Sequence, residues 1–421
     1  GTSRRQRQMC IRDRFNTQIG AGNSGRQGFL RPETAQGMFT SFPSIYRHFR
    51  ERLPFGAIQV GKGYRNEISP RQGMIRLREF NMAELEYFID PEANVEHDFS
   101  SWKDEITLIS EDAGEIKSTI ENAVTNKIIR HTTVGYFMGK TLDFLVKVGI
   151  KVNYLRFRQH QSNEMAHYAQ DCWDAEILGS YGWVECVGIA HRGCYDLEAH
   201  ENATGHRLKA WRKFESPKVV ETDGWTTDGS KTGPAFRALA GKVKLEVEGL
   251  PASTVFPTEV NIDGQVIQIL EEHVKRVQIT QNVTGEWYTP HVVEPAFGID
   301  RIIWHLLDHN YMELEKGGEE YARLTLPDDV APIDVTILPL YEKDGMDELA
   351  LEIHRNLCDK PGVFSVYDAS GSIGRRYARA DEVGVPYCLT VDQDSVSDGT
   401  ITIRERDTGE QKRIKVEDLP F

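Results

Sequence analysis

One stretch, residues 63–88, constrains the fold of this chain more than any other. It reads GYRNEISPRQGMIRLREFNMAELEYF and joins two extended runs, 57–69 and 74–90, through a turn-forming Pro-Arg-Gln-Gly. This pattern predicts a long antiparallel hairpin. Strand side chains alternate between faces, which groups Arg65 with Glu67 on the first strand and Arg76, Arg78, Phe80, Met82, Glu84 and Glu86 on the second.

That grouping combines arginines, a flat aromatic ring and carboxylates on one sheet surface. Planar guanidinium groups suit phosphate oxygens, and an aromatic ring suits a stacked base. A carboxylate can accept a hydrogen bond from an adenine amino group. The pattern is therefore typical of a nucleotide site, but a solvated ladder of ion pairs across a hairpin would give the same residues.

A second segment, EPAFGIDR at 294–301, predicts a sharp junction between a strand and a helix. The helix carries an apolar stripe at Ile299, Ile302, Ile303, Leu306 and Leu307. Arg301 lies off the stripe in the first turn, where the positive helix end favours a phosphate or a stacked base; an ordinary surface arginine is the alternative. Glu33, in RPETAQG, similarly begins a helix expected over 34–53, bent or interrupted at Pro43.

Two further segments, RFRQHQSNEMAHYAQDCWDAE and GWVECVGIAHRGCYDL, are rich in aromatic residues and contain scattered histidines and cysteines. The spacing of His160, His167 and Cys172 matches no common zinc signature, so we expect no metal site there. Glu185 on a strand and Arg192 beyond it are the polar candidates. The sequence has neither a P-loop nor a Gly-rich dinucleotide motif, so any nucleotide use is of another kind.

Charge is unevenly distributed along the 421 residues. The whole chain has 50 Lys and Arg against 64 Asp and Glu, whereas residues 1–80 have 15 against 5. The basic segment can face phosphates while the acidic remainder stays solvated, although an uneven surface alone is the simpler explanation. Six cysteines without a CxxC pair indicate no disulfide scaffold, and no apolar run is long enough for a membrane. We therefore expect a cytoplasmic protein without a membrane partner.

The rest of the chain divides into recognisable sections. We expect residues 98–150 to be mostly helical, with Ile106, Ile109, Ile116, Ile120 and Val124 on one face. Residues 15–30 look loop-like, and 201–290 suggest an insertion with short strands such as KVKLEVEG. A polar linker over 310–332 precedes a small α/β domain in which strands and helices alternate. Residues 1–14 show no periodicity and are interpreted as a non-native leader.

Taken together, these segments resemble glycyl-tRNA synthetases of the class II homodimeric type, the archaeal and eukaryotic branch in particular. RPETAQGMF, the hairpin, LRFRQHQSNEMAHYAQDCWDAE and EPAFGIDR carry the resemblance, with the hairpin as motif 2 and EPAFGIDR as motif 3. SGSIGRRYARADEVGVPYCLTVD resembles an anticodon-binding domain. The implied fold is α+β: a class II antiparallel sheet flanked by helices over 15–325, with insertions at about 98–150 and 201–285, and an anticodon-binding domain over 330–421.

The resemblance also implies roles for single residues. Arg65 would contact the ATP α-phosphate, Glu67 the adenine side and Arg76 the outer phosphates. Phe80 and Arg301 would stack on the two faces of adenine, and Glu185, with Cys186 through its backbone, would hold the nucleotide or its magnesium. The full expected ATP set is Arg65, Asn66, Glu67, Arg76, Leu77, Phe80, Glu185, Cys186 and Arg301, with Arg65 and Arg301 as catalytic residues.

For glycine, the resemblance implies Glu33, Glu84 and Glu294 around the ammonium and Arg192 on the carboxylate, with Ala296 nearby. Arg375, Arg376 and Arg379 would face tRNA phosphates, with a solvated helix face as the alternative. The implied substrates are glycine, ATP with Mg²⁺ and tRNA(Gly), with no zinc and no organic cofactor. The intact enzyme is expected to be a homodimer.

Two departures from the family pattern bear on activity. Ala296 replaces a serine that is usual in the family, and the motif 1 expected upstream of Phe15 is missing, which indicates an N-terminally truncated enzyme. Two other readings stay open: a synthetase-like fragment that binds nucleic acid without catalysis, and a class II synthetase for proline or threonine. The motif arginines and three glutamates disfavour the first reading, and RPETAQG and EFNMAELE disfavour the second.

Overall fold

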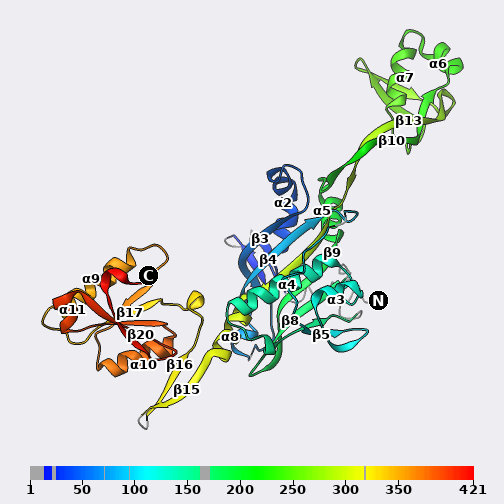
Figure 1. Ribbon diagram of the computed structural model, residues 1–421. Helices are drawn as coiled ribbons and strands as arrows, with labels where there is room; N and C mark the ends of the chain where they lie inside the picture. Colours follow the sequence, from blue (N-terminus) through cyan, green and yellow to red (C-terminus); the bar gives the residue numbers. More distant parts are fainter. Residues whose placement is uncertain (1–13, 21–24, 71, 94, 162–170, 317–318) are drawn as a thin grey trace. The chain divides into compact units, whose positions relative to one another are not determined.

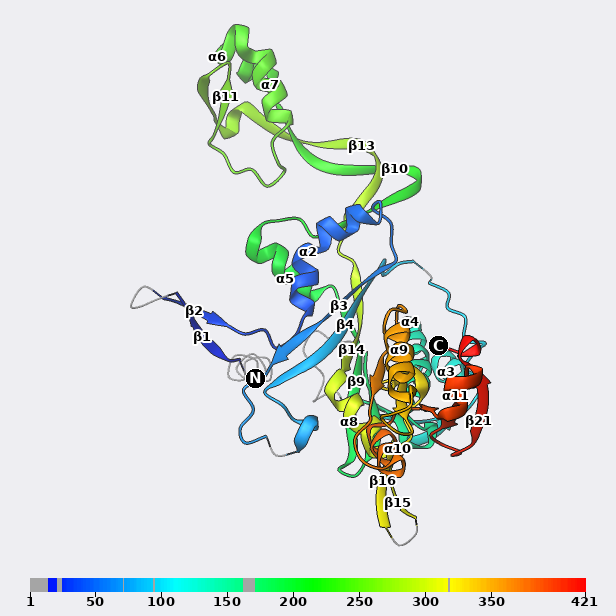
Figure 2. The ribbon, with the colours of Figure 1, turned by 90° about the vertical axis from the view of Figure 1, so that its left-hand side faces the viewer.

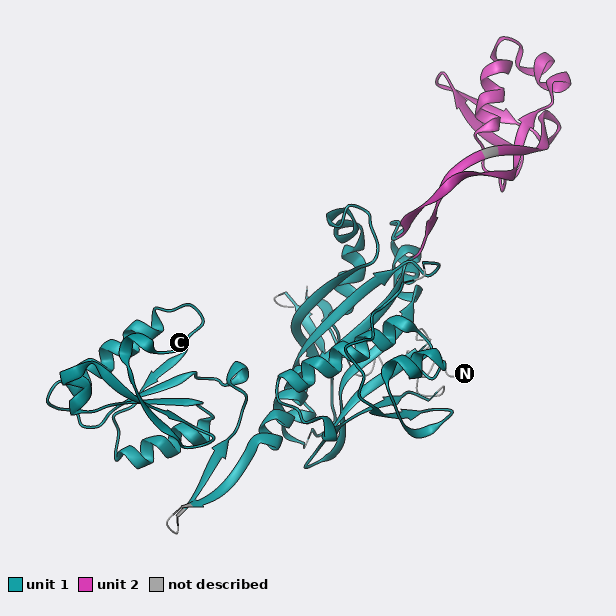
Figure 3. Ribbon diagram, viewed as in Figure 1, with its two compact units in different colours: residues 1–208, 290–421 teal, residues 209–289 magenta. Residues whose placement is uncertain are grey.

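The computed structural model describes residues 14–20, 25–70, 72–93, 95–161, 171–316 and 319–421. Contacts divide the chain into two compact units, 1–208 with 290–421 and 209–289 (Figure 3). Within the described residues, no helix is both long and apolar enough to cross a membrane.

An eight-stranded sheet forms the centre of the first unit (Figure 1). Its order is β3-β4-β14-β9-β8-β7-β5-β6, and only the β5–β7 pair is parallel. The strands are β3 Phe55–Tyr64, β4 Glu79–Ile89, β5 Ile106–Ser110, β6 Gly114–Ser118, β7 Leu155–Gln159, β8 Asp171–Gly179, β9 Gly182–Gly193 and β14 His291–Gly298. The antiparallel class II sheet that the resemblance implies is confirmed.

The two faces of β4 have different neighbours because its side chains alternate. Tyr87 packs edge-on against Phe137 of α4 (Thr132–Lys147), with ring centroids 5.2 Å apart. On the opposite face, Phe88 is fully buried among aromatic rings, including Phe42 of α2 (Ala35–His48) at 5.1 Å. Helices therefore cover both faces of β4 at the end that contains Tyr87 and Phe88. Toward the other end, the face that carries Phe80, Met82 and Glu84 borders the site described below.

Three further helices flank this sheet. α3 (Ile120–Thr125) contacts α4, and α5 (Tyr195–Thr204) lies beside α2 (Figure 2). α8 (Ile299–Asn310) follows β14 directly and contacts β4, β8 and β9. The α2 helix is shorter than the predicted 34–53 and continues through Pro43. Residues 15–30, expected as a loop, form the hairpin of β1 (Asn16–Ile19) and β2 (Arg26–Phe29).

The prediction of a helix spanning the isoleucines of 98–150 is wrong. Ile106 and Ile109 lie in β5 and Ile116 in β6, so only Ile120 and Val124 are helical. The burial of β5 alternates residue by residue, as a strand requires, and Gly114 has the positive φ of 69° that the turn into β6 needs. The stretch that we expected as an insertion thus contributes two strands to the central sheet.

The second unit has a small core of its own, made of Val243, Val247, Val260, Ile262 and Ile269. The prediction of a strand for KVKLEVEG is wrong, because this segment lies in helix α7. Val243 and Val247 are one helical turn apart, and both are fully buried. The elements are β10 Ala210–Thr227, α6 Gly229–Phe236, α7 Ala240–Glu248, β11 Thr258–Ile262, β12 Gln265–Ile269 and β13 Val274–Tyr288; β10 pairs with β13, and β11 with β12.

The C-terminal domain is a five-stranded sheet of order β18-β17-β19-β20-β21. The predicted alternation of strands and helices is confirmed, with β17 parallel to both β18 and β19. Its elements are β17 Val335–Pro339, α9 Met346–Cys358, β18 Ser365–Tyr367, α10 Ile373–Val383, β19 Tyr387–Val391, α11 Gln393–Asp398, β20 Thr400–Glu405 and β21 Gln411–Lys415.

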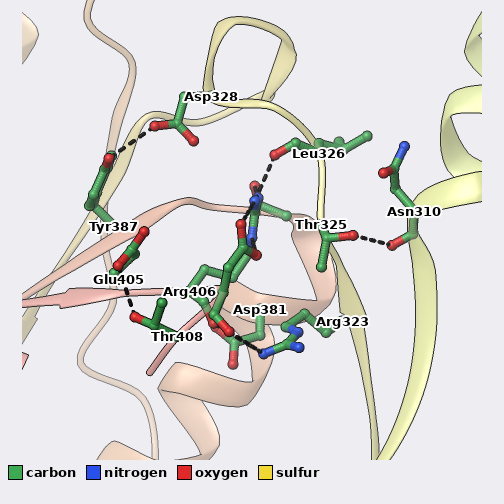
Figure 4. Close-up of polar contacts among 12 residues, drawn as sticks. Asn310, Arg323, Thr325, Leu326, Asp328, Asp381, Tyr387, Glu405, Arg406 and Thr408 are labelled. Carbon is green, nitrogen blue, oxygen red and sulfur yellow. Dashed lines mark hydrogen bonds and ion pairs between the residues drawn. The ribbon is translucent and has the colours of Figure 1, made fainter. Parts of the chain in front are cut away.

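The expected polar linker contains a hairpin of β15 (Tyr311–Lys316) and β16 (Glu319–Leu324), and the residues after it bind to the C-terminal domain (Figure 4). Arg406, 2% exposed, donates to the main-chain oxygens of Leu326 at 2.6 Å and Gly384 at 2.8 Å. Tyr387 donates its hydroxyl to Asp328 at 2.9 Å. These contacts tie the end of the linker to the domain that follows.

Candidate active site

A pocket of about 340 Å³ opens on the face of the central sheet that carries Phe80, Met82 and Glu84. Strand pairing aligns Glu84, Ala296, Gly188 and Asp174 in one row across β4, β14, β9 and β8. Because glycine and alanine have little or no side chain, the middle of this row forms a low floor. Charged residues on the neighbouring strands surround the floor.

The hairpin supplies one end of the pocket. The Arg76 guanidinium lies 3.4 Å from Glu67, and Arg78 donates to the Glu67 main-chain oxygen at 2.9 Å. Arg65 lies over the Phe80 ring, 5.6 Å from its centroid. Arg65, Glu67, Arg76 and Phe80 line the pocket with Met82 and Glu84, so the predicted grouping is observed in part. Arg78 and Glu86 do not line it, and β4 begins at Glu79, so Arg76 and Arg78 lie before the strand and not on it as predicted.

Arg301 approaches the same end from the first turn of α8. It donates to the main-chain oxygens of Ile75 at 3.1 Å and Glu185 at 2.6 Å, and it lies 3.9 Å from the Glu185 carboxylate. Its neighbour Asp300 accepts hydrogen bonds from the main chain and side chain of Asn81 on β4, at 2.5 Å and 3.0 Å. Asp300 thereby fastens the start of α8 to the hairpin, which positions Arg301.

Glu84 anchors the opposite end of the pocket to helix α2. One carboxylate oxygen accepts three hydrogen bonds, from the Thr34 amide at 2.7 Å, the Thr34 hydroxyl at 2.5 Å and the Ala35 amide at 2.8 Å. Burial, together with the nearby Glu294 charge, raises the pKa of Glu84 to about 7, although the hydrogen bonds from Thr34 oppose this rise.

Arg192 lies among the carboxylates and is 3% exposed. Its guanidinium contacts Glu294 at 2.5 Å and Asp196 at 2.9 Å, and Glu33 lies 4.0 Å away. Glu86 is fully buried close by, and burial, followed by the Glu294 charge, raises its pKa well above the ordinary value. This end of the pocket is thus an acidic well around one buried arginine, and it is the end at which the resemblance places glycine.

The remaining expected site residues are placed unevenly. Leu77 and Ala296 line the pocket, whereas Asn66 does not. Cys186 lines the pocket but is buried, and its sulfur lies 3.4 Å from the Val184 oxygen and 3.6 Å from His305, so its thiol is turned to protein atoms.

Among the described residues, His160, Cys172 and Asp174 form one group with potential metal ligands, all within 4.8 Å of one another. His160 is bound to Asp174 at 2.7 Å, and Arg158 lies 3.3 Å from the same carboxylate oxygen. A neighbouring guanidinium disfavours a second cation at that oxygen. His167, the other histidine weighed in the sequence, lies outside the described residues.

Sequence reasoning missed three residues that organise the site, Thr34, Asp196 and Asp300, and it placed Glu86 on the hairpin face without giving it a role. Asp300 follows Gly298 at the start of a helix, where acidic residues are common, so it carried no distinct signal. Asp196 lies four residues after Arg192, a spacing that suits an ion pair on a helix but gave no reason to expect one at a strand end.

The tRNA assignment of Arg376 on α10 needs correction. Arg376 is 5% exposed and donates to the main-chain oxygens of Gly371 at 2.8 Å and Pro339 at 2.5 Å, so it cannot face RNA phosphates. It lies one residue, or about 100°, from Arg375 around the helix. Arg375 and Arg379 are exposed, and Arg379 is paired with Asp368.

This fold and its pocket define a class II aminoacyl-tRNA synthetase. Residues 21–310 match the family model "tRNA synthetase class II core domain (G, H, P, S and T)", and residues 334–420 match "Anticodon binding domain". A prolyl-tRNA synthetase of Giardia lamblia, solved with prolyl-adenylate, has the same fold, with a TM-score of 0.53 and 14% identity over 97% of this chain and 60% of that one.

The chain belongs to the glycine–tRNA ligase family, archaeal type. It is 46% identical to the glycine–tRNA ligase of Archaeoglobus fulgidus over 96% of this chain and 71% of that protein. Identity to the Methanocaldococcus jannaschii ligase is 43%, over 96% of this chain and 73% of that protein. The family predicted from the motifs is confirmed.

Proposed function

We propose that this chain activates glycine with ATP to glycyl-adenylate and transfers the glycyl group to the 3′ end of tRNA(Gly). The observation that carries the proposal is the shared pocket. Three glutamates and a buried arginine lie at one end, and Arg65, Arg76, Phe80 and Arg301 lie at the other. The small floor residues between the two ends leave room for a substrate that spans them.

ATP occupies the hairpin end in this proposal. Arg65 contacts the α-phosphate, Arg76 the outer phosphates and Glu67 the adenine edge. Phe80 stacks on adenine, with Arg301 on its other face. The exposed Glu185 carboxylate next to Arg301 is suited to hold the Mg²⁺ that accompanies the triphosphate, because magnesium prefers oxygen ligands.

Glycine occupies the acidic well. Its ammonium lies among Glu33, Glu84 and Glu294, and its carboxylate faces the positive charge of Arg192. Asp196 and Glu294 hold Arg192 in place, so substrate binding needs little rearrangement. We expect selection against alanine to be steric, with the well excluding an added methyl group. Ala296 stands where the family usually has serine and has no hydroxyl group. Neighbouring residues must therefore make the contact with the substrate that the serine hydroxyl would make.

The first half-reaction requires little proton transfer. The glycine carboxylate is already ionised at neutral pH, so its oxygen bonds to the α-phosphorus without a general base. The bond from that phosphorus to the bridging oxygen breaks, and pyrophosphate leaves with the electron pair. Arg65 and Arg76 stabilise the negative charge that develops on the phosphate oxygens, and the pocket aligns the reactants. Catalysis thus depends on position and charge.

We extend the proposal to a homodimer in the cytoplasm. The edge strand β3 exposes Ile58 and Val60, at 70% and 68%, which supports coverage by a second subunit. In the C-terminal domain, Arg375 is the candidate for tRNA phosphates.

Glycine-dependent exchange of pyrophosphate into ATP tests the proposal, with alanine, serine and proline as controls. Exchange with glycine alone is the expected result. Exchange with proline would favour another specificity, and no exchange would favour a nucleic-acid-binding fragment. Glu294→Gln should lose glycine-dependent exchange, because it removes one charge from the well without changing its size.

A further inference from the structure

A histidine–carboxylate pair on the pocket wall has no part in the proposed function so far. The Nε2 atom of His160 lies 2.7 Å from Asp174 Oδ2, and both residues line the pocket. Asp174 on β8 is 1% exposed, whereas His160 is partly exposed just beyond β7. The pair therefore consists of a buried carboxylate and a partly exposed imidazole, both on the pocket wall.

The contacts of this pair define which ring nitrogen can act. An ionised aspartate only accepts hydrogen bonds, so neutral His160 carries its proton on Nε2 and keeps a lone pair on Nδ1. Among the described parts of the chain, Nδ1 has no hydrogen-bond partner. Arg158 binds both Asp174, at 3.3 Å, and Glu176, at 3.1 Å, which fixes the carboxylate. The hydrogen bond to Asp174 thus orients the imidazole and leaves its basic Nδ1 atom available to accept a proton.

Strand pairing places this pair opposite the glycine end. The His160 amide donates to the Cys172 oxygen, Cys172 pairs with Ala190 and Ala190 pairs with Glu294. His160 and Glu294 are therefore in one row, separated by Cys172 and the small Ala190. A glycyl group held at Glu294 lies across this floor from the imidazole.

A metal ion is a weaker explanation for the same residues. It would require Cys172 to ionise, but burial and the surrounding carboxylates raise the pKa of that thiol far above its ordinary value. It would also displace His160 from Asp174 beside the Arg158 charge. The existing hydrogen bond satisfies the histidine and the carboxylate without a metal.

We propose that His160, oriented by Asp174, accepts the proton of the terminal ribose hydroxyl of tRNA in the transfer step. The hydroxyl oxygen bonds to the glycyl carbonyl carbon, the bond from that carbon to the AMP phosphate oxygen breaks, and AMP leaves with the electron pair. The hydroxyl proton moves to Nδ1 of His160. This inference rests on the proposed function, and it concerns the half-reaction in which the nucleophile carries a proton.

Two assays on the full chain separate the half-reactions: pyrophosphate exchange, and single-turnover transfer from preformed glycyl-adenylate to a tRNA(Gly) transcript. His160→Gln should keep exchange within about twofold and slow transfer about 100-fold, the usual contribution of a general base. His354→Gln is the matched control, because that histidine bonds Ser365 in the C-terminal domain, at 2.8 Å, and should leave both rates unchanged.

The pH profile and chemical rescue distinguish a proton acceptor from a structural residue. Asp174 raises the pKa of His160, chiefly through its hydrogen bond, and the Glu185 charge adds to this rise. Burial and the Arg158 charge lower the same pKa. The Cys172 thiol next to the pair is uncharged. Wild-type transfer should rise with pH through an inflection above 6.5 and then level off. His160→Gln should lose the rise, and added imidazole should partly restore His160→Ala.

Three results would overturn the inference. Unchanged transfer in His160→Gln would leave the proton to another acceptor, such as the AMP phosphate. Equal losses in both assays would place His160 in nucleotide binding or folding. Absence of exchange by the wild-type chain would contradict both the proposed function and this inference. Normal exchange by the wild-type chain, with transfer unaffected in His160→Gln, would contradict the inference alone.

Discussion

Arg301 of the pocket and Arg376 of helix α10 are anchored in the same way but differ in how much of the guanidinium group stays exposed. Arg301 is held by two main-chain oxygens yet still lines the pocket, with its side chain 34% exposed. Arg376 is also held by main-chain oxygens, but it is buried inside its own domain. An arginine in a family motif is therefore a ligand-binding candidate only when its anchors leave the guanidinium at a surface that a ligand can reach.

Arg65→Ala should produce the largest effect on activity. In the proposed function this side chain stabilises charge on the α-phosphate, and loss of one such donor typically costs about 10²–10³-fold in rate. Glycine-dependent exchange measures the loss. Arg65→Lys should recover little of it, because an ammonium cannot replace a planar fork. An Arg65→Ala chain that exchanges normally would place Arg65 with the structural arginines.

Arg376→Ala should instead reduce stability. The variant leaves the buried Pro339 oxygen without its donor and also removes the hydrogen bond to the exposed Gly371, which costs about 1–3 kcal/mol. Hydrogen exchange at β17 and β19 measures this locally, and pyrophosphate exchange should stay normal. Unchanged protection of both strands together with weaker tRNA binding would reverse the assignment of Arg376 as structural.

Glu84→Gln tests how the acidic well affects folding. The pKa of Glu84 is raised from 4.5 to about 7, so the folded chain holds its proton more tightly than the unfolded chain. Its contribution to stability is therefore greatest below pH 4.5 and is lost as pH rises towards 7. Wild-type stability should fall by about 1–3 kcal/mol more than that of the variant between pH 5 and 8.

Urea unfolding at a series of pH values gives this difference. The glutamine retains an oxygen that can accept from Thr34, so loss of the α2 anchor should be limited. Glu86, whose pKa is also raised, should leave some pH dependence in the variant. Identical pH dependence in both chains would show that Glu84 is ionised without penalty.

The sequence predicted which residues line the pocket better than it predicted the sections around the pocket. Strand alternation placed Phe80, Met82 and Glu84 on one face because the period of two is set by backbone geometry. The isoleucines of 98–150 were misassigned because spacings of three and four also arise when two short strands follow one another. The burial of Arg376 depends on Pro339, which is distant in sequence, so no local pattern could reveal it.

Arg375→Ala should give the smallest effect and tests what α10 offers to RNA. Arg375 is exposed, and among the described residues it forms no hydrogen bond or ion pair, whereas Arg379 is held by Asp368 and Ser370. Loss of one phosphate contact should weaken aminoacylation at limiting tRNA about two- to fivefold and lower the salt dependence of binding by about one ion. Pyrophosphate exchange and stability should not change. Arg379→Ala should weaken tRNA binding less, because Asp368 already neutralises its charge; a larger effect at Arg379 than at Arg375 would mean that RNA displaces this ion pair.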